Sequence, residues 1–180
     1  MATVGVSSGI VSGIATGTAT VTYTLPTGCY NTITVTVNSV PAAITGTQVV
    51  CGGQTTTLSN TSTGGTWSSG STGIATVGSS SGIVTGVSGG NANITYTVSN
   101  GCFSTAAVTV NPAPASITGS GNVCIGYTTT LADATTGGTW ISGDASIATV
   151  SFSTGVVTGQ AAGTAVMTYI IGSTSCYTTR

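Results

Sequence analysis

The feature that most constrains this chain is a repeat with a period of 73 residues. One phrase occurs three times, as ATVGVSSGIVSG (2–13), ATVGSSSGIVTG (75–86) and ATVSFSTGVVTG (148–159). The same step separates Trp67 from Trp140 and Cys51 from Cys124. Registers this regular across 180 residues indicate a tandem array of like modules.

Proline-spaced segments mark the predicted module boundaries. VPAAITG (40–46) and NPAPASITG (111–119) are typical of short, fairly stiff linkers. We predict the C-terminal part of a repeat in residues 1–41, a complete repeat in 42–114, and a repeat lacking its last strand in 115–180. The final cysteine lies 74 residues beyond its counterpart, which indicates one inserted residue in a loop near 172–175. No signal peptide precedes the first phrase, so we expect the sequence to be part of a longer secreted chain.

The pattern within each repeat is that of β-structure. Apolar and hydroxyl residues alternate, glycine-rich turns separate the runs, and no helical periodicity appears. In the complete repeat we expect strands near 43–50, 54–60, 65–69, 74–78, 82–87, 91–99 and 104–110. The fold class is therefore all-β, with about seven short antiparallel strands packed as a small sandwich in each complete repeat.

Charged side chains are nearly absent. The chain carries only Asp133, Asp144 and Arg180 and has no histidine, so 2% of its residues are charged, whereas about 25% is typical. A hydroxyl nucleophile needs a base to activate it, and no His, Lys or Glu is present to act as one. We therefore predict that the protein is not an enzyme and uses no cofactor.

The same composition argues against several kinds of partner. Calcium sites need six to eight oxygens and usually several carboxylates, and the complete repeat has Asn60 and Ser71 where the next repeat has its aspartates. We thus expect no metal site. The net charge of −1 offers no basic surface to nucleic acid, and no apolar run approaches 18 residues, so we expect no membrane span.

One ordered set of motifs closely resembles a known family. The motifs are GGTWSS (64–69), IATV (74–77), GIVTG (82–86), GNANITY (90–96) and VTVNP (108–112), and the family is the bacterial immunoglobulin-like domain, group 2, of invasin- and intimin-type adhesins. The resemblance implies tandem immunoglobulin-like sandwiches in an extracellular protein. The cysteines are not part of the general pattern, and they are similar to a variant found in very large secreted proteins of Bacteroidetes-type bacteria.

The resemblance also implies roles for the aromatic residues. It places Trp67 and Trp140 inside the sandwich, although an exposed tryptophan could instead stack on a sugar. Tyr23, Tyr96 and Tyr169 are expected to be core residues with one polar end.

Five cysteines favour an oxidising compartment, and two pairings are open. Bonds within repeats would join Cys51 to Cys102 and Cys124 to Cys176. Strand parity instead places Cys51 and Cys102 at opposite ends of one module, roughly 20 Å apart, which is too far for a disulfide. The alternative is a bond from Cys51 to Cys176 across the domain junction. In either scheme Cys29 has its partner outside the chain.

These features together predict an extracellular or cell-surface stalk, fibre or filament whose partners are neighbouring repeats of the same or an identical chain. Two alternatives remain. The modules could themselves bind a glycan or another surface, as adhesive domains do. The chain could also be the subunit of a filament that assembles by sharing strands.

Overall fold

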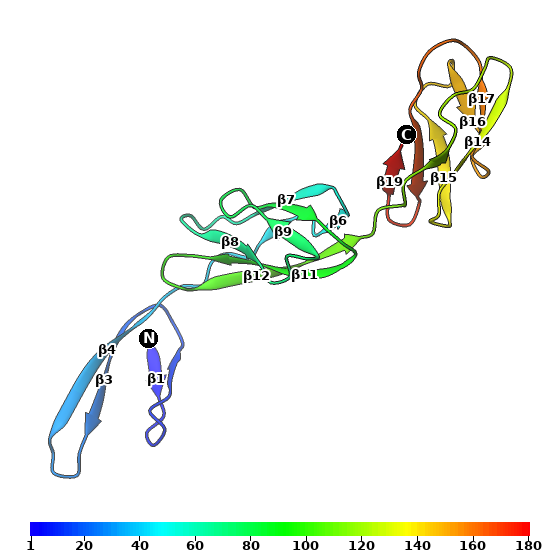
Figure 1. The fold of residues 1–180 in the computed structure, drawn as a ribbon. Coiled ribbons are helices and arrows are strands. Elements are labelled where there is room, and N and C mark those ends of the chain that lie inside the picture. Colours follow the sequence, from blue (N-terminus) through cyan, green and yellow to red (C-terminus); the bar gives the residue numbers. More distant parts are fainter.

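The computed structural model describes residues 1–180 as an all-β chain. Its strands form three groups that follow one another along an extended path (Figure 1). The middle and C-terminal groups each have a hydrophobic core of their own. The division at 41/42 and 114/115 that we inferred from the linkers stays a prediction.

The middle group packs two four-stranded sheets against each other. The first sheet has the order β5 (Thr45–Gly46), β7 (Thr55–Ser59), β10 (Ile83–Gly86) and β9 (Ala75–Val77). The second has the order β6 (Val49–Cys51), β12 (Phe103–Asn111), β11 (Gly90–Thr97) and β8 (Thr66–Ser69). Twelve buried residues form the core of this group.

Alternation along the strands explains this core. Successive side chains of a strand point to opposite faces of the sheet, so every second residue can be apolar and buried. In β12 the buried residues are Ala106, Val108 and Val110, and in β11 they include Ala92 and Ile94. The residues between them are mostly threonine and asparagine. The pattern that predicted strands thus also identifies the face that packs inward.

The expected first strand, 43–50, is divided between the two sheets. β5 pairs with β7 in the first sheet, and β6 pairs with β12 in the second. Gly46 lies at the end of β5 with a φ of +115°, and a Cβ there would collide with the carbonyl oxygen of Thr57. Because β6 runs parallel to β12, the prediction that all strands are antiparallel is wrong.

The C-terminal group repeats most of this arrangement around a core of seven buried residues. One sheet has the order β13 (Thr118–Gly119), β14 (Thr128–Ala132), β17 (Val156–Gly159) and β16 (Ala148–Val150). The other has the order β15 (Gly138–Ser142), β18 (Met167–Ile171) and β19 (Cys176–Thr179).

The C-terminal group contains the first part of its last strand, β19. This corrects the expectation that residues 115–180 lack that strand. β19 pairs with β18 in antiparallel register. The ladder ends at Arg180, whose backbone exchanges hydrogen bonds of 2.8 and 2.9 Å with Met167. The pairing with the preceding strand therefore continues to residue 180.

The N-terminal group consists of two hairpins, β1 (Ala2–Val4) with β2 (Val11–Gly13) and β3 (Gly17–Thr24) with β4 (Tyr30–Val37). Tyr23 is 71% exposed, so its assignment to the core is wrong. The physical reason is that the strand carrying the tryptophan in the other two groups has no counterpart in residues 1–41.

Each of the two cores contains one tryptophan packed on one tyrosine. The ring centroids of Trp67 and Tyr96 lie 4.7 Å apart at an angle of 53°. Trp140 and Tyr169 repeat this arrangement at 4.8 Å and 51°. All four side chains are buried. Tilted aromatic pairs at this separation add to the stability that burial alone provides.

The tyrosine hydroxyl is the polar end of each pair. Tyr96 accepts a hydrogen bond from the amide of Gly65 at 2.9 Å and donates one to the carbonyl of Ser62 at 2.7 Å. The hydroxyl of Tyr169 makes the same two bonds, at 2.9 and 2.6 Å, with the backbone of Gly138 and Thr135. The tyrosine thereby ties the loop before the tryptophan strand to the neighbouring strand of the same sheet.

We predict that Tyr96→Phe destabilises the middle group by about 1–3 kcal/mol, because two partly buried backbone groups lose their hydrogen-bond partner. Guanidinium unfolding followed by tryptophan fluorescence measures the change. Tyr23→Phe is the matched control, since that side chain is exposed, and it should leave the unfolding midpoint unchanged. An equal loss in both variants would contradict the assignment.

Candidate functional site: the junction disulfide

The few charged residues do not gather into a reactive site. Nowhere in the structure do three His, Cys, Asp or Glu side chains form a group that could hold a metal ion. Asp144 accepts hydrogen bonds from the hydroxyl of Ser146 at 2.6 Å and from its amide at 3.0 Å. These bonds hold the pKa of Asp144 below its usual value. They stabilise a local turn.

The two tryptophans do not form a surface site for a sugar. Trp67 and Trp140 are 7% and 5% exposed, so neither presents a ring face on which a sugar could stack. The chain contains no helix of the length and apolar character needed to cross a bilayer. The remaining group with distinctive chemistry is the set of five cysteines.

Cys51 lies at the end of the middle group that faces the C-terminal group. It is the last residue of β6 and stands opposite Asn111, where β12 ends and the linker begins. Gly52 and Gly53 turn the chain directly after it: the amide of Gly52 donates to the carbonyl of Asn111 at 2.8 Å, and the amide of Gly53 to that of Gly86 at 2.8 Å. Cys51 is thus held close to the point where the chain leaves the middle module.

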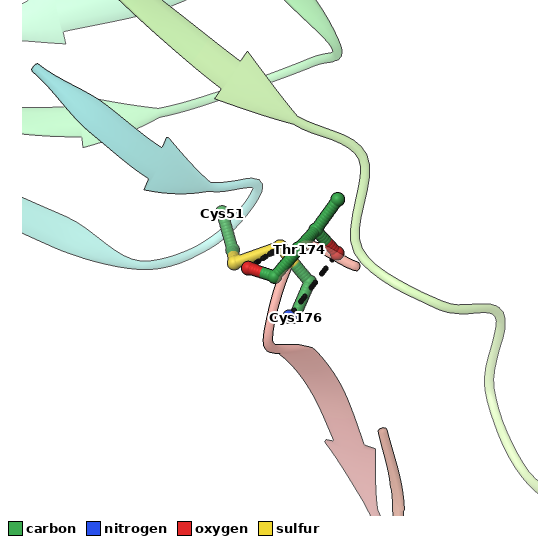
Figure 2. The surroundings of a disulfide bond; sticks show 3 residues. All are labelled: Cys51, Thr174 and Cys176. Atoms are coloured by element: carbon green, nitrogen blue, oxygen red, sulfur yellow. Dashed lines mark hydrogen bonds between the residues drawn. A yellow bond between two sulfur atoms is a disulfide. The ribbon is translucent and has the colours of Figure 1, made fainter. Parts of the chain in front are cut away.

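Cys176 lies at the facing end of the C-terminal group. It is the first residue of β19 and is fully buried, directly after the loop between β18 and β19. Ser175 in this loop has a φ of +58°, whereas the equivalent residue before Cys102 is Gly101, with a φ of +85°. The amide of Cys176 donates to the hydroxyl of Thr174 at 3.3 Å (Figure 2). The inserted residue inferred from the repeat lies in this turn.

The structure joins these two cysteines in a disulfide across the junction (Figure 2). Their Cα atoms lie 5.6 Å apart, which is close to the usual separation for such a bond. The two residues are 125 positions apart in the sequence. The bond therefore connects two successive modules and leaves each module without an internal disulfide.

The alternative pairings within modules are not formed. Cys102 precedes β12 and Cys51 stands opposite its far end, so nine strand residues separate them. At about 3.3 Å per residue this is roughly 30 Å, and a disulfide requires less than about 7 Å. Cys102 is a half-buried free thiol, and Cys29 and Cys124 are exposed free thiols.

The linker beside the disulfide is short and fixed at its far end. Pro112 and Ala113 are exposed, but Pro114 is buried, and the amide of Ala115 donates to the hydroxyl of Thr135 at 2.9 Å. The two modules therefore have two covalent connections near each other, the backbone and the disulfide. The disulfide restricts movements of the two modules that would separate Cys51 from Cys176.

Asn60 of the middle module and its counterpart Asp133 of the C-terminal module differ in their hydrogen bonds near the linker. Asn60 donates from Nδ2 to the carbonyl of Ala42 at 2.6 Å, and its Oδ1 accepts from the amide of Ser62 at 2.9 Å. Its counterpart Asp133 accepts from Thr135 at 2.7 Å, while its Oδ2 is buried without a partner. The alignment of Asp133 with Asn60 in the repeat is the sequence signal that this position has a structural role.

Comparison with protein families finds a similarity in this part of the chain. Residues 104–176 match the model of the bacterial Ig-like domain (group 2). The matched stretch begins in β12 and ends at Cys176, so it crosses the linker and includes the hairpin that bears the junction cysteine. No curated protein sequence matches the chain.

Several solved structures are similar to the chain at low identity. Domains 1–6 of surface layer protein SbsC are 16% identical, with a TM-score of 0.37 over 96% of this chain and 36% of that one. A C-terminal 282-residue fragment of intimin, in complex with the intimin-binding domain of its translocated receptor, is 16% identical, with a TM-score of 0.41 over 79% and 64%. The human desmocollin-1 ectodomain is 12% identical, with a TM-score of 0.28 over 87% and 39%. The chain thus spans about a third of the SbsC fragment.

We predict that Asp133→Asn stabilises the C-terminal module by about 1–3 kcal/mol, because the amide could donate where the carboxylate has an unpaired buried oxygen. The reciprocal change Asn60→Asp should destabilise the middle module by a similar amount. Denaturant unfolding of both variants at neutral pH measures the effects. Changes of the same sign in the two variants would show that the two sites are not equivalent.

Proposed function

We propose that this chain is a segment of an extracellular stalk or fibre, in which Ig-like modules in series carry tension. The observation that supports this most directly is the Cys51–Cys176 bond, which joins one module to the next. Separate cores on the two sides of a short linker support the same conclusion, because each module is then an independent spacer.

The disulfide changes the path that tension takes. Tension applied to the two ends of the chain is transmitted through the residues up to Cys51 and then through the disulfide to Cys176. It then leaves through β19. The linker and the strands from β7 to β18 lie outside this path, so they are not extended while the bond is intact. Such a bond would limit the lengthening of the stalk even when modules unfold.

The disulfide also supports a location outside the cytoplasm. Structural disulfides persist in oxidising surroundings outside the cytoplasm. The surface is polar through its hydroxyl groups, with charged residues at 2% of the chain. Cys102 and Cys124 occupy the positions of Cys176 and Cys51 in their own modules, so each is available for the same kind of bond with a further module. The proposed partners are therefore neighbouring modules of this kind.

We predict that single-molecule pulling between the two ends gives a final extension about 400 Å shorter for the oxidised than for the reduced chain. The reason is that the bond encloses a separation of 125 residues, and each extended residue adds roughly 3.3–3.6 Å. Force–extension curves with and without a reducing agent measure the difference.

Two serine variants make this test specific. Cys51→Ser should give the long extension without any reductant, whereas Cys102→Ser, which removes a free thiol, should keep the short one. Equal contour lengths for the unsubstituted oxidised chain and Cys51→Ser would rule out a tension-bearing bond between the modules.

A further inference from the structure

One exposed aromatic residue recurs in all three groups of strands. It directly follows the cysteine at the start of the last strand of each repeat, as Tyr30, Phe103 and Tyr177. These side chains are 72%, 59% and 47% exposed. Phe152, which is also exposed, has no such counterpart, because the equivalent residue of the middle module is Ser79. The recurrent ring is therefore a feature of the module itself.

The strand registers place this ring on the outward face of the second sheet. Phe103 of β12 stands opposite Thr97 of β11, and Thr97 stands opposite Thr66 of β8. Ala106 and Val108 of β12 are buried in the core, and alternate residues of a strand face opposite sides of the sheet. The odd-numbered residues of β12, Phe103 among them, therefore face away from the core.

The rest of this face in the middle module carries hydroxyl and amide groups. Its polar residues beyond the row of the ring are Ser68, Asn91, Asn93, Thr95, Thr105 and Thr109. The three charged residues of the chain all lie in the C-terminal module, so the face has no charge. All four strands of the sheet are present in the middle module, and the face is therefore formed by residues 49–111 alone.

The ring remains accessible at a formed junction between two modules. The residue before Tyr177 makes the disulfide with Cys51 of the middle module, and Tyr177 is nevertheless 47% exposed. Its neighbours across the sheet are Ile170 and, one strand further, Thr139. A preceding module therefore leaves this position open, and we expect the same for Phe103.

The chemistry of this face suits an uncharged sugar. An aromatic ring offers a flat apolar surface against which the C–H groups of a sugar can pack, and the hydroxyl and amide groups beside it can bond sugar hydroxyls. A charged polysaccharide would find no opposite charge here. A stable protein interface buries about 1,200–2,000 Å² around an apolar centre, whereas on this face one ring stands among hydroxyl groups. A neutral polysaccharide is therefore the ligand class that fits.

We propose that this face binds a neutral polysaccharide, with the ring of Phe103 in the middle module and of Tyr177 in the C-terminal module packed on one of its sugars. In the middle module the hydroxyls of Thr97 and Thr66, in the same row, bond hydroxyl groups of the polysaccharide. Because the face encloses little of its ligand, one site binds weakly, and several sites on one chain raise the affinity for a polymer. The inference does not rest on the proposed stalk, since each site is formed within one module.

The test measures depletion of the full chain from solution by particles of neutral glucan, mannan, galactan and chitin, and by the acidic polysaccharide alginate. We expect saturable binding to at least one neutral polysaccharide. Replacing Tyr30, Phe103 and Tyr177 together by alanine should weaken this binding at least about tenfold, because each site loses its ring. The matched control replaces three similarly exposed rings outside the face by alanine and should leave the affinity unchanged. These rings are Tyr23, Tyr127 and Phe152.

A second measurement needs no substitution. Nitration of tyrosines in the unsubstituted chain, mapped by mass spectrometry, should become slower at Tyr177 when the polysaccharide is bound. Tyr127, which is 71% exposed and lies outside the face, should keep its rate.

The outcomes decide the proposal as follows. Loss of binding in the face variant alone, together with protection of Tyr177, supports it. The proposal is overturned if no neutral polysaccharide binds, if alginate alone binds, or if the face variant and the control variant lose affinity equally. Oligomers that the face variant alone dissociates, without binding to any polysaccharide, would show that the face joins two copies of the chain, which also overturns the proposal.

Discussion

The parallel pairing of β6 with β12 is the interaction on which the junction depends. It places the last residue of β6 opposite the last residue of β12, so Cys51 lies where the chain leaves the module. An antiparallel first strand confined to the other sheet would not bring a side chain to this edge. The split of the first strand at Gly46 therefore determines whether a cysteine at position 51 can reach the next module.

The second requirement is a cysteine at the facing end of the following module. Cys176 provides it because the hairpin between β18 and β19 turns at that end, and the buried position of its side chain leaves it little freedom. The bond and the anchored linker then act together. Pro114 and the Ala115–Thr135 hydrogen bond fix the start of the second module, and the disulfide restrains the hairpin beside it.

Much of this arrangement could be predicted from the sequence. The repeat and the alternation of apolar residues led to the strands and to the fold class, because both patterns follow directly from the geometry of a sheet. The two candidate disulfide schemes also came from the sequence, since strand parity alone shows which loops share an end. A choice between them needed the observed register of β6 against β12.

Other features depend on contacts that no local pattern contains. Tyr23 has the sequence context of Tyr96 and Tyr169, yet it is exposed because no tryptophan strand packs beside it. Asp133 has the composition of a loop residue, but it occupies the position of an asparagine that holds the linker. In both cases the repeat alignment shows which residues are equivalent. Whether the equivalent residues have the same surroundings depends on the groups that pack beside them.

The most direct test of the account is the disulfide connectivity of the oxidised chain. Chymotrypsin, which cuts after aromatic residues and leucine, should place each of the five cysteines in a separate peptide, and mass spectrometry without reduction identifies the linked pair. The account predicts a peptide containing Cys51 joined to one containing Cys176, with the other three cysteines free. A Cys51 peptide joined to the Cys102 peptide would contradict it.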